Sequence, residues 1–597
     1  MKFSSLSAGS LSLGGYAGSL ISKVVDKDYL DEEKYHLFAK QFSLHSDSSG
    51  SWRGEFWGKF LRGACQCYKL TNNQKLYSII ENSVFEMISY IEEDGALSSY
   101  IKEERFTGWD MWGRKYAMAG FLSYFDISKD EEKRKIVLSS TCRVADEIMA
   151  HVGKEEGKKD ILATSNIYGS LNSSSILGVY VALYLFTKEK KYLDFASYIV
   201  SSGLSSGEDL LKNAIEPNNF PYEWKSKKAY EMIATFQGVF YYGLATKEEK
   251  YIDIVIDFVK KVANTDFTIV GGIGTESEFF NNSSYTQTEP SKKPGLETCV
   301  TVSFMSLCED LLKYTGDAYF ASLIETMSYN ALFGATNDQN QKLNLAEGRV
   351  WRLDGYDTPP HEPYFFDSYS PLVSDRRAQV VGGYQRLQDN RSFGCCAANG
   401  GFGLGLVGDF AILRGEKSYL LNFYNDFEAK DIYEGEEITF SLKANLYRSG
   451  KCQLHINGKG KQFTLYLRKP DFANCEILLN GKEVSLPLTK KSYYEINRSW
   501  GDEEIDINFP LTITPILLNN KIAFKRGPIV LALDSRLSSI KEEASSTSEG
   551  VLIANNLFFN NETIKLSNGL RLCDYSSAGK NMDDIGSGLS VWMEPKK

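Results

Sequence analysis

Four residues in two short clusters have the chemistry of a metal site. Glu297-Thr298-Cys299 lies in the middle of the chain, and the adjacent pair Cys395-Cys396 follows about a hundred residues later. Three thiolates and one carboxylate suit zinc, because this borderline-soft ion binds both sulfur and oxygen in tetrahedral sets. Either cluster alone is weak evidence, since two adjacent cysteines in a reduced protein are usually buried small apolar side chains. Together they predict a zinc site made of Glu297, Cys299, Cys395 and Cys396.

The sequence around both clusters favours reactive thiols. Cys395-Cys396 lies among small residues, between Gly394 and the stretch Ala397 to Gly401, where a backbone can approach a metal closely. Glu297 and Cys299 open an apolar stretch of helical character, and the amides at a helix N-terminus lower the pKa of a nearby thiol. We therefore expect helix ends to position both clusters.

Length and composition limit the class of protein. A chain of 597 residues suggests roughly two to four domains. The formal net charge of -10 argues against nucleic acid and anionic membranes as partners, so a neutral substrate fits better. Aromatic residues make up 13% of the chain, which suits a protein that stacks rings on sugars, although a large core uses the same residues.

The cysteines and the N-terminus indicate a reducing compartment. Ten cysteines without regular spacing are too sparse for a disulfide scaffold. The first residues are rich in serine and glycine and lack the apolar core of a secretory signal, and no apolar run is expected to approach the roughly 18 residues of a membrane span. We expect a soluble cytoplasmic protein; a leader trimmed before residue 1 and assembly into a homodimer both stay open.

A recurring sequence motif, called the threonine motif below, predicts the turns of helical hairpins. A hydrophobic residue, a threonine and a lysine-tyrosine pair recur between apolar stretches with helical periodicity. Copies lie at residues 70–77, 186–193, 245–252 and 314–320, with a degraded fifth at 125–130. Roughly five or six such hairpins bury all their apolar faces when they close into a ring, so the repeat predicts an (α/α)6 toroid, with an open solenoid as the alternative.

The pattern changes to short alternating strands after about residue 415. Asn-Gly and Gly-Lys turns separate stretches such as 437–442, 463–468 and 505–509, which is typical of a β-sandwich. A second β-unit is expected to begin near Ile522. The prediction is a multidomain chain, α then β, that divides into an (α/α)6 barrel over residues 1–415, a β-sandwich domain over 416–520 and a C-terminal β-rich domain over 521–597.

The loop before Glu297 holds glycines and two carboxylates. The run Gly271-Gly272-Ile273-Gly274 has no P-loop lysine and no Rossmann pattern after it, so it is a weak nucleotide signal. Glu276 and Glu278 precede Phe279-Phe280, and a carboxyl group against a ring is desolvated, which raises its pKa toward the range of a general acid. Simple surface exposure is the alternative for either glutamate taken alone.

Several short motifs that include these residues follow one another in a particular order along the chain. The set comprises Gly271-Gly272-Ile273-Gly274 with Glu278-Phe279-Phe280, Glu297-Thr298-Cys299-Val300-Thr301, Tyr329-Asn330-Ala331-Leu332, Ser370-Pro371-Leu372, and Cys395-Cys396 with Asn399 and Gly400. Similar stretches also occur at residues 55–59, 109–116, 172–177 and 228–232. Over roughly residues 10 to 530 the chain resembles glycoside hydrolase family 127, the β-L-arabinofuranosidase-like enzymes, as a divergent member.

The resemblance implies a fold, a cofactor and a mechanism. It implies an (α/α)6 catalytic barrel followed by β-sandwich domains, and a zinc-dependent retaining exo-glycosidase that releases a terminal L-arabinofuranose-like or related sugar from a glycoside or oligosaccharide. Carried over residue by residue, Glu297, Cys299, Cys395 and Cys396 would hold Zn2+. Cys395 would form a thioglycosyl intermediate, while Glu278 would protonate the leaving oxygen and then activate water.

The chain departs from the family pattern where members bring histidines to the sugar. It has five histidines, and none lies near Trp112-Gly113-Arg114 or Ala229-Tyr230-Glu231, although His361 is on a loop that could reach the cleft. A different furanose, a pyranose or an acidic sugar is therefore open. Seven residues are expected to contact substrate: Trp57, Trp109, Asp110, Trp112, Arg114, Tyr230 and Glu231. For the tryptophans a place in the core, and for Asp110 a helix cap, are the alternatives.

Two other classes of function compete with a zinc glycosidase. Four protein ligands look like a closed structural zinc site, which would suit a non-catalytic carbohydrate-binding protein. A polysaccharide lyase or sugar epimerase would also use an α/α toroid, but with a histidine or tyrosine base and carboxylates, so the cysteines argue against it.

Overall fold

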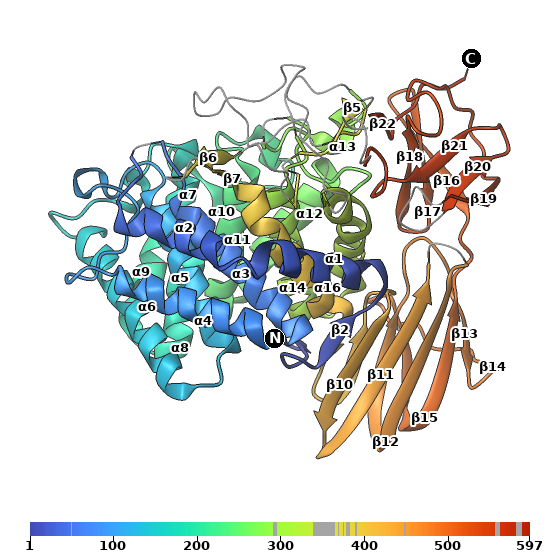
Figure 1. Cartoon of the computed structure of the whole chain (residues 1–597), viewed down its shortest axis with the longest axis horizontal. Helices are drawn as coiled ribbons and strands as arrows, with labels where there is room; N and C mark the ends of the chain where they lie inside the picture. The colour runs from blue at the N-terminus through green and yellow to red at the C-terminus, as the bar shows by residue number, and fades with distance from the viewer. Residues whose placement is uncertain are drawn as a thin grey trace.

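The computed structural model has a helical part beside two β-sheet units (Figure 1). It describes residues 1–48, 50–276, 278–289, 295–337, 365–367, 369–373, 375–377, 383–387, 391–446, 449–555, 562–580 and 588–596. His361 lies outside the described residues. The order of the elements, helices first and then strands, confirms the predicted fold class.

In this described part, six inner helices form a closed ring, because each packs against the next and the last returns to the first. They are α3 (Gly54–Thr71), α5 (Asp110–Ile127), α8 (Leu177–Thr187), α11 (Ala229–Thr246), α14 (Thr298–Thr315) and α16 (Cys395–Ala411). Around them lie α1 (Gly15–Val24), α2 (Glu32–Ser43), α4 (Gln74–Ser89), α6 (Glu131–His151), α9 (Lys190–Ser201), α12 (Glu249–Thr265) and α15 (Ala318–Thr326). Short helices α7 (Leu171–Ser174), α10 (Leu210–Ile215) and α13 (Ser283–Thr286) lie in the connections. The (α/α)6 barrel is confirmed, and the open solenoid is excluded.

The recurring threonine motif forms the hairpin turns between inner and outer helices. Inner helices α3, α8, α11 and α14 each end on the threonine, whose hydroxyl donates to the carbonyl oxygen four residues earlier at 2.7 to 2.9 Å. The next residue takes a left-handed conformation that ends the helix, at Asn72, Lys188, Lys247 and Gly316. In the degraded copy Ser128 stays extended instead, so that turn is built differently.

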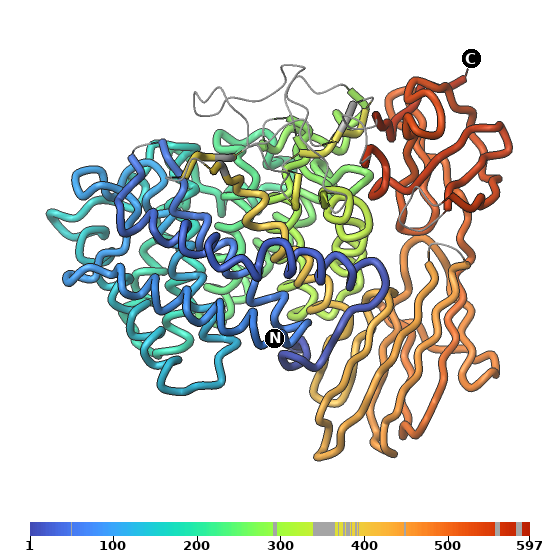
Figure 2. Tube along the Cα trace, in the orientation of Figure 1, coloured from blue at the N-terminus to red at the C-terminus, as the bar shows by residue number. Residues whose placement is uncertain are grey.

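One sheet of ten strands forms the first β unit, and the N-terminus joins it. Its strands are β1 (Ser4–Ser5), β2 (Leu11–Leu13), β8 (Ile412–Arg414), β9 (Ser418–Leu421), β10 (Phe427–Tyr433), β11 (Glu436–Asn445), β12 (Lys451–Arg468), β13 (Glu476–Leu479), β14 (Lys482–Glu483) and β15 (Tyr493–Asn508). Side chains of β10 alternate strictly between buried and exposed, as one covered face of a sheet requires. Strand β1 pairs with β8 and β2 with β10, so the start of the chain runs along the β unit before it enters the barrel (Figure 2).

A second sheet of eight strands forms the C-terminal unit. It contains β16 (Ile513–Leu518), β17 (Lys521–Arg526), β18 (Ile529–Asp534), β19 (Gly550–Ala554), β20 (Glu562–Leu566), β21 (Arg571–Asp574), β22 (Gly588–Ser590) and β5 (Asp375–Arg376). Because β16 pairs with β17, the change from one sheet to the next comes before residue 513 rather than at 520. The domain limits stay a prediction. They assign residues 4–13 to the barrel although these residues pair with strands of the first sheet, and they assign β16 to the first β domain although it pairs with a strand of the second sheet.

One helical stretch has the length and composition of a membrane span. Residues 168–187 meet both criteria, which corrects the expectation that no apolar run comes near this length. Since 67% of its most apolar window is buried inside the molecule and α8 is an inner helix of the barrel, the stretch serves as core.

Candidate active site

The two predicted metal clusters meet at one end of the barrel. The ligand atoms of Glu297, Cys299, Cys395 and Cys396 all lie within 4.8 Å of one another, and all four residues are buried. Glu297 Oε1 is 3.9 Å from Cys395 Sγ and 3.7 Å from Cys396 Sγ, while the two vicinal sulfurs are 3.8 Å apart. Residues separated by about a hundred positions in sequence therefore form a single group.

The spacing and chemistry of this group fit a zinc ion. A tetrahedral zinc with Zn–S bonds of about 2.3 Å places neighbouring sulfurs about 3.8 Å apart, which matches the 3.8 Å between the sulfurs of Cys395 and Cys396. Within the described residues, Glu297 Oε2 is buried without a hydrogen-bond partner. A buried carboxylate oxygen of this kind is costly unless a cation or donor satisfies it.

Helix starts position the cysteines. Cys395 and Cys396 are the first residues of α16, and Cys299 lies in the first turn of α14, so the positive dipole ends of both helices lie at the sulfur group. The hairpin of β6 (Tyr384–Arg386) and β7 (Ser392–Gly394) leads directly into α16. Gly383, at φ +63°, lies so close that a Cβ there would be 2.3 Å from Cys395 Sγ, and its carbonyl accepts from the Cys395 amide.

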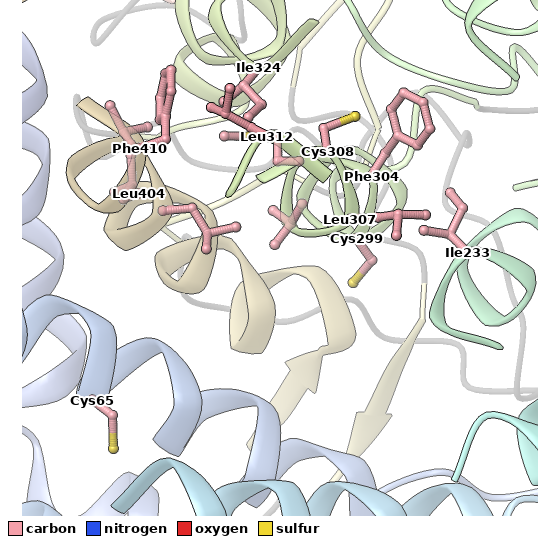
Figure 3. Close-up of a cluster of buried hydrophobic side chains, with 14 of the residues drawn as sticks. Cys65, Ile233, Cys299, Phe304, Leu307, Cys308, Leu312, Ile324, Leu404 and Phe410 are labelled. Atoms are coloured by element: carbon pink, nitrogen blue, oxygen red, sulfur yellow. The ribbon is translucent and has the colours of Figure 1, made fainter. Parts of the chain in front are cut away.

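Cys299 and Cys308 project from opposite sides of α14 (Figure 3). Nine residues make two and a half helical turns, which explains the opposite directions. Cys308 is fully buried in the core, so only one of the two cysteines of this helix faces the metal group.

Buried charges surround the sulfur group. Burial raises the pKa of the Cys299 thiol, but hydrogen bonds from Cys395 and Cys396 and the charge of Lys59 outweigh it and bring the pKa to about 6. Lys59 Nζ lies 4.0 Å from Cys299 Sγ and 3.0 Å from Glu55 Oε2. The arrangement thus favours a thiolate at Cys299 even without a metal.

Glu278 is held next to this group by two partners. Lys228 forms an ion pair with one of its carboxylate oxygens, and the hydroxyl of Tyr369 donates to the other. Glu278 adopts φ +63°, a strained conformation for a residue with a side chain. Its negative charge also reaches the metal group, because after burial it is the largest cause that raises the pKa of Glu297. Glu276, the other candidate acid, is exposed.

Four of the seven predicted substrate contacts lie around the mouth of the site. The Trp109 ring is half-buried, with its centroid 6.1 Å from those of Trp112 and Tyr168. Trp112 donates its indole N–H to Glu55, and the Tyr230 hydroxyl bonds to that of Tyr116. Glu231 is 3% exposed, and its Oε2 has no hydrogen-bond partner within the described residues. These positions suit substrate contact, which stays a prediction.

The other three predicted contacts belong to the interior. Trp57 is fully buried, packs against Phe121 and donates to Ser83 Oγ at 2.9 Å. Asp110 and Arg114 are four residues apart on one face of α5 and form an ion pair at 3.0 Å, and Arg114 also pairs with Glu147 of α6 at 2.6 Å. Their role as sugar contacts stays a prediction: Trp57 and Arg114 have partners on outer helices, and Asp110 pairs with Arg114 and accepts from Ser98.

Sequence reasoning missed three residues of the site. Lys59 and Lys228 are buried lysines, and Tyr369 follows Asp367, whose carbonyl accepts from Thr298. The signal for Lys59 was its spacing of four from Glu55, which places both side chains on one helix face. Nothing local in the sequence links Lys228 or Tyr369 to Glu278.

The comparison with family models decides the family. Residues 22–344 match the model described as β-L-arabinofuranosidase, GH127 catalytic domain. The chain belongs to glycoside hydrolase family 127. Residues 420–511 match the model of the middle domain of the same family, so the resemblance in the motifs is confirmed and the chain is a glycoside hydrolase.

Solved structures of the family share the fold over nearly the whole chain. A GH127 β-L-arabinofuranosidase from Geobacillus stearothermophilus T6 has a TM-score of 0.72 at 17% identity, covering 98% of this chain and 100% of its own. Another GH127 β-arabinofuranosidase has a TM-score of 0.73 at 16% identity, covering 100% of this chain and 98% of its own. A comparison with curated proteins finds no match. At such low identity these likenesses establish the fold alone.

Proposed function

We propose that this family 127 member is a zinc-dependent retaining exo-glycoside hydrolase that releases a terminal L-arabinofuranose-like or related sugar through a cysteine thioglycosyl intermediate. The observation that carries the proposal is the group of Glu297, Cys299, Cys395 and Cys396 within 4.8 Å of one another, next to a partnered Glu278. The mechanism and the sugar are proposals, whereas membership of the family is established above.

Cys395 is the proposed nucleophile. At 7% exposure it is the most accessible of the four ligands, whereas Cys299 and Cys396 are fully buried. Bound zinc would keep the thiolate ligands deprotonated near neutral pH. The Cys395 sulfur attacks the anomeric carbon, the bond to the leaving oxygen breaks, and a carbon–sulfur bond joins the sugar to the protein.

Glu278 is the proposed acid and base. It gives a proton to the leaving oxygen in the first step and takes one from water in the second, when the water oxygen replaces the sulfur. Two displacements at the same carbon keep its configuration. Lys228 and Tyr369 fix both oxygens of this carboxylate, which limits its rotation and orients it for proton transfer.

Glu231, Lys228 and Trp109 are suited to hold the sugar. Burial raises the pKa of Glu231 and the charge of Lys228 lowers it in part, while the unsatisfied oxygen of Glu231 can accept from a sugar hydroxyl. Burial alone would lower the pKa of Lys228, but the neighbouring carboxylates of Glu231, Glu278 and Glu297 raise it well above its usual value. A charged Lys228 and an aromatic surface at Trp109 would bind a polar ring.

A labelling experiment tests the nucleophile. The purified protein is first screened against p-nitrophenyl α- and β-L-arabinofuranosides, pyranosides and acidic sugars to find its substrate. The matching sugar with a haloacetamide at its reducing end should then add mass at Cys395 and not at Cys396, and the natural product should keep its anomeric configuration. Labelling of a carboxylate, or an inverted product, would refute the cysteine mechanism.

Zinc content tests the metal site separately. Cys299→Ser should lower the zinc bound per chain from about one to well below it, together with thermal stability, because metal affinity contributes to folding free energy. Cys308→Ser is the matched control, since this cysteine lies on the same helix but faces the core. Equal zinc in both variants would contradict the assignment. Zinc binding without turnover of any glycoside would instead support the non-catalytic alternative.

A further inference from the structure

The barrel holds a cavity below the metal group, on the side of the C-terminal ends of the inner helices. It has a volume of about 410 Å3, and all six inner helices line it. Its lining runs from Lys115 and Tyr230 near the site to Lys69, Phe186 and Lys313 in the last turns of their helices. Because Phe186 is 46% exposed, the cavity approaches the surface at the end of the barrel opposite the cysteines. The volume lies within the range of small-molecule sites.

Two cations in this cavity have no acidic partner. Lys115 is 8% exposed, and its Nζ lies 4.3 Å from the ring centroid of Trp112 and 4.9 Å from that of Tyr116. The guanidinium of Arg62 lies 5.8 Å from the same Tyr116 ring and 4.1 Å from the Phe402 ring. Among the described residues, no carboxylate lies within ion-pair distance of either side chain. Arg114, beside Lys115 in sequence, points instead to Asp110 and Glu147.

The carboxylates of the cavity are already engaged elsewhere. Asp126 pairs with Lys69 at 2.6 Å, and Glu309 pairs with Lys313 at 2.6 Å. Asp310 accepts from the Tyr241 hydroxyl and Gln237, and Asp409 accepts from Gln66. Positive charge is therefore left over at the inner end, around Tyr116, whereas toward the outer end Asp310 and Asp409 have hydrogen-bond donors but, among the described residues, no cation within ion-pair distance.

An unpaired cation in a protein interior is costly, which applies to Lys115, and the half-buried Arg62 beside the same Tyr116 ring adds repulsion. Burial, followed by the charges of Arg62 and Lys59, lowers the pKa of Lys115 well below its usual value. A bound anion would satisfy both groups and favour the charged form of the lysine. Polar residues such as Gln237, Ser303 and Asn399 line the rest of the cavity and suit a hydroxylated ligand.

We propose that the lumen of the barrel binds a small soluble anion, with its carboxylate or phosphate group between Arg62 and Lys115. The site is separate from the proposed chemistry at the cysteines and does not depend on it. The ligand enters at the outer end, near Phe186. Its class is a carboxylic acid or phosphate ester small enough for the cavity.

Calorimetric titration of the full chain tests the site, with inorganic phosphate and citrate as probes at constant ionic strength set by chloride. We expect saturable binding of one anion per chain by at least one probe, and the probe that binds distinguishes phosphate from carboxylate recognition. Arg62→Met and Lys115→Met should each weaken binding at least tenfold. Lys69→Met is the control, because Lys69 lines the same cavity but is paired with Asp126, and it should change affinity less than twofold.

Two further measurements separate binding from folding and from the metal. Without anion, Lys115→Met should melt at or above the wild-type temperature, since it removes an unpaired buried cation. The anion should raise the melting temperature of wild type and of Lys69→Met but not that of Lys115→Met. Binding should persist after zinc is removed by a chelator. Absence of saturable binding by both probes, equal loss in Lys69→Met, or loss with the zinc would overturn the proposal.

Discussion

Lysines buried beside anionic groups shape the reactivity of single residues in this site. Lys59 lies 4.0 Å from the Cys299 sulfur, and Lys228 forms an ion pair with Glu278. In a site with little water such charges act strongly on their neighbours, and the charge of Lys59 lowers the pKa of the Cys299 thiol. Lys59 thus favours the thiolate at Cys299, while Lys228 orients the carboxylate of Glu278.

Glu278→Gln should slow turnover of the identified substrate by roughly two to four orders of magnitude, because general acid and base catalysis is lost. Zinc content and melting temperature should change little, since the amide can still accept from Tyr369. Glu276→Gln is the control, as Glu276 is exposed in the same loop. If Glu276→Gln were the inactive variant, the two glutamates would exchange roles.

Glu309 in the barrel lumen should make stability depend on pH. Burial raises its pKa to about 7, with Lys313 lowering it in part. A raised pKa means that the folded state favours the protonated carboxyl. The resulting stabilisation of the fold is fully present below about pH 4.5, and it is lost as pH rises through 7, which lowers the free energy of unfolding by about 3 kcal/mol. Glu309→Gln should therefore lose less melting temperature than wild type between pH 5 and pH 8.

Calorimetric scans at the two pH values measure this difference, which should amount to a few degrees. Glu131→Gln, at an exposed glutamate in the first turn of α6, is the control and should follow wild type. A Glu309→Gln variant with the same pH dependence as wild type would show that this carboxyl does not change its ionisation on folding.

At the scale of elements, helix starts position the cysteines and helix ends form the hairpin turns. The starts of α14 and α16 bring the cysteines together, and the ends of α3, α8, α11 and α14 make the hairpin turns with a threonine and a left-handed residue. A left-handed conformation costs a residue with a Cβ roughly 1 kcal/mol, so the turns that lack glycine carry a small strain.

Lys188→Gly should stabilise the barrel by about 0.5 to 1 kcal/mol, because Lys188 is exposed at φ +61° after α8 and glycine adopts this conformation freely. A rise in melting temperature of about 1 °C is the expected result. Lys190→Gly, two residues later in the first turn of α9, should instead destabilise by about 1 kcal/mol. Equal effects in the two variants would contradict this account of the turn.

At the scale of the whole molecule, the N-terminus ties the barrel to the first β unit. Strands β1 and β2 cover the edges offered by β8 and β10 before the chain turns into α1 (Figure 2). Exposed sheet edges pair with other chains and promote aggregation. The first residues therefore protect the sheet although they precede it by some 400 positions.

Deletion of residues 1–14 should lower the melting temperature and increase aggregation, because two strand edges lose their partners. Light scattering during a thermal scan measures both effects. A chain that lacks only Met1, which is 56% exposed, is the control and should behave as wild type. Unchanged scattering after the longer deletion would show that the edges are protected in another way.

Local patterns were enough to predict much of this architecture. The threonine motif marked the hairpin turns, and alternation of polar and apolar residues marked the strands β11, β12 and β15, because both signals arise within a few residues of chain. The four metal-group residues were also predictable, since their side-chain types and their motifs are readable without knowing the fold.

Tertiary structure alone decided which face of each helix meets the site. In α5, Trp112 and Tyr116 bond to Glu55 and Tyr230 on other inner helices, while Arg114 pairs with Glu147 of the outer helix α6 and with Asp110, although all four belong to one motif. The sequence determined the helical period but not its phase, because the phase depends on partners far along the chain. For the same reason the hydrogen bond of Trp57 to Ser83, and the pairing of Glu278 with Lys228 and Tyr369, 50 and 91 residues away, became visible only in the folded barrel.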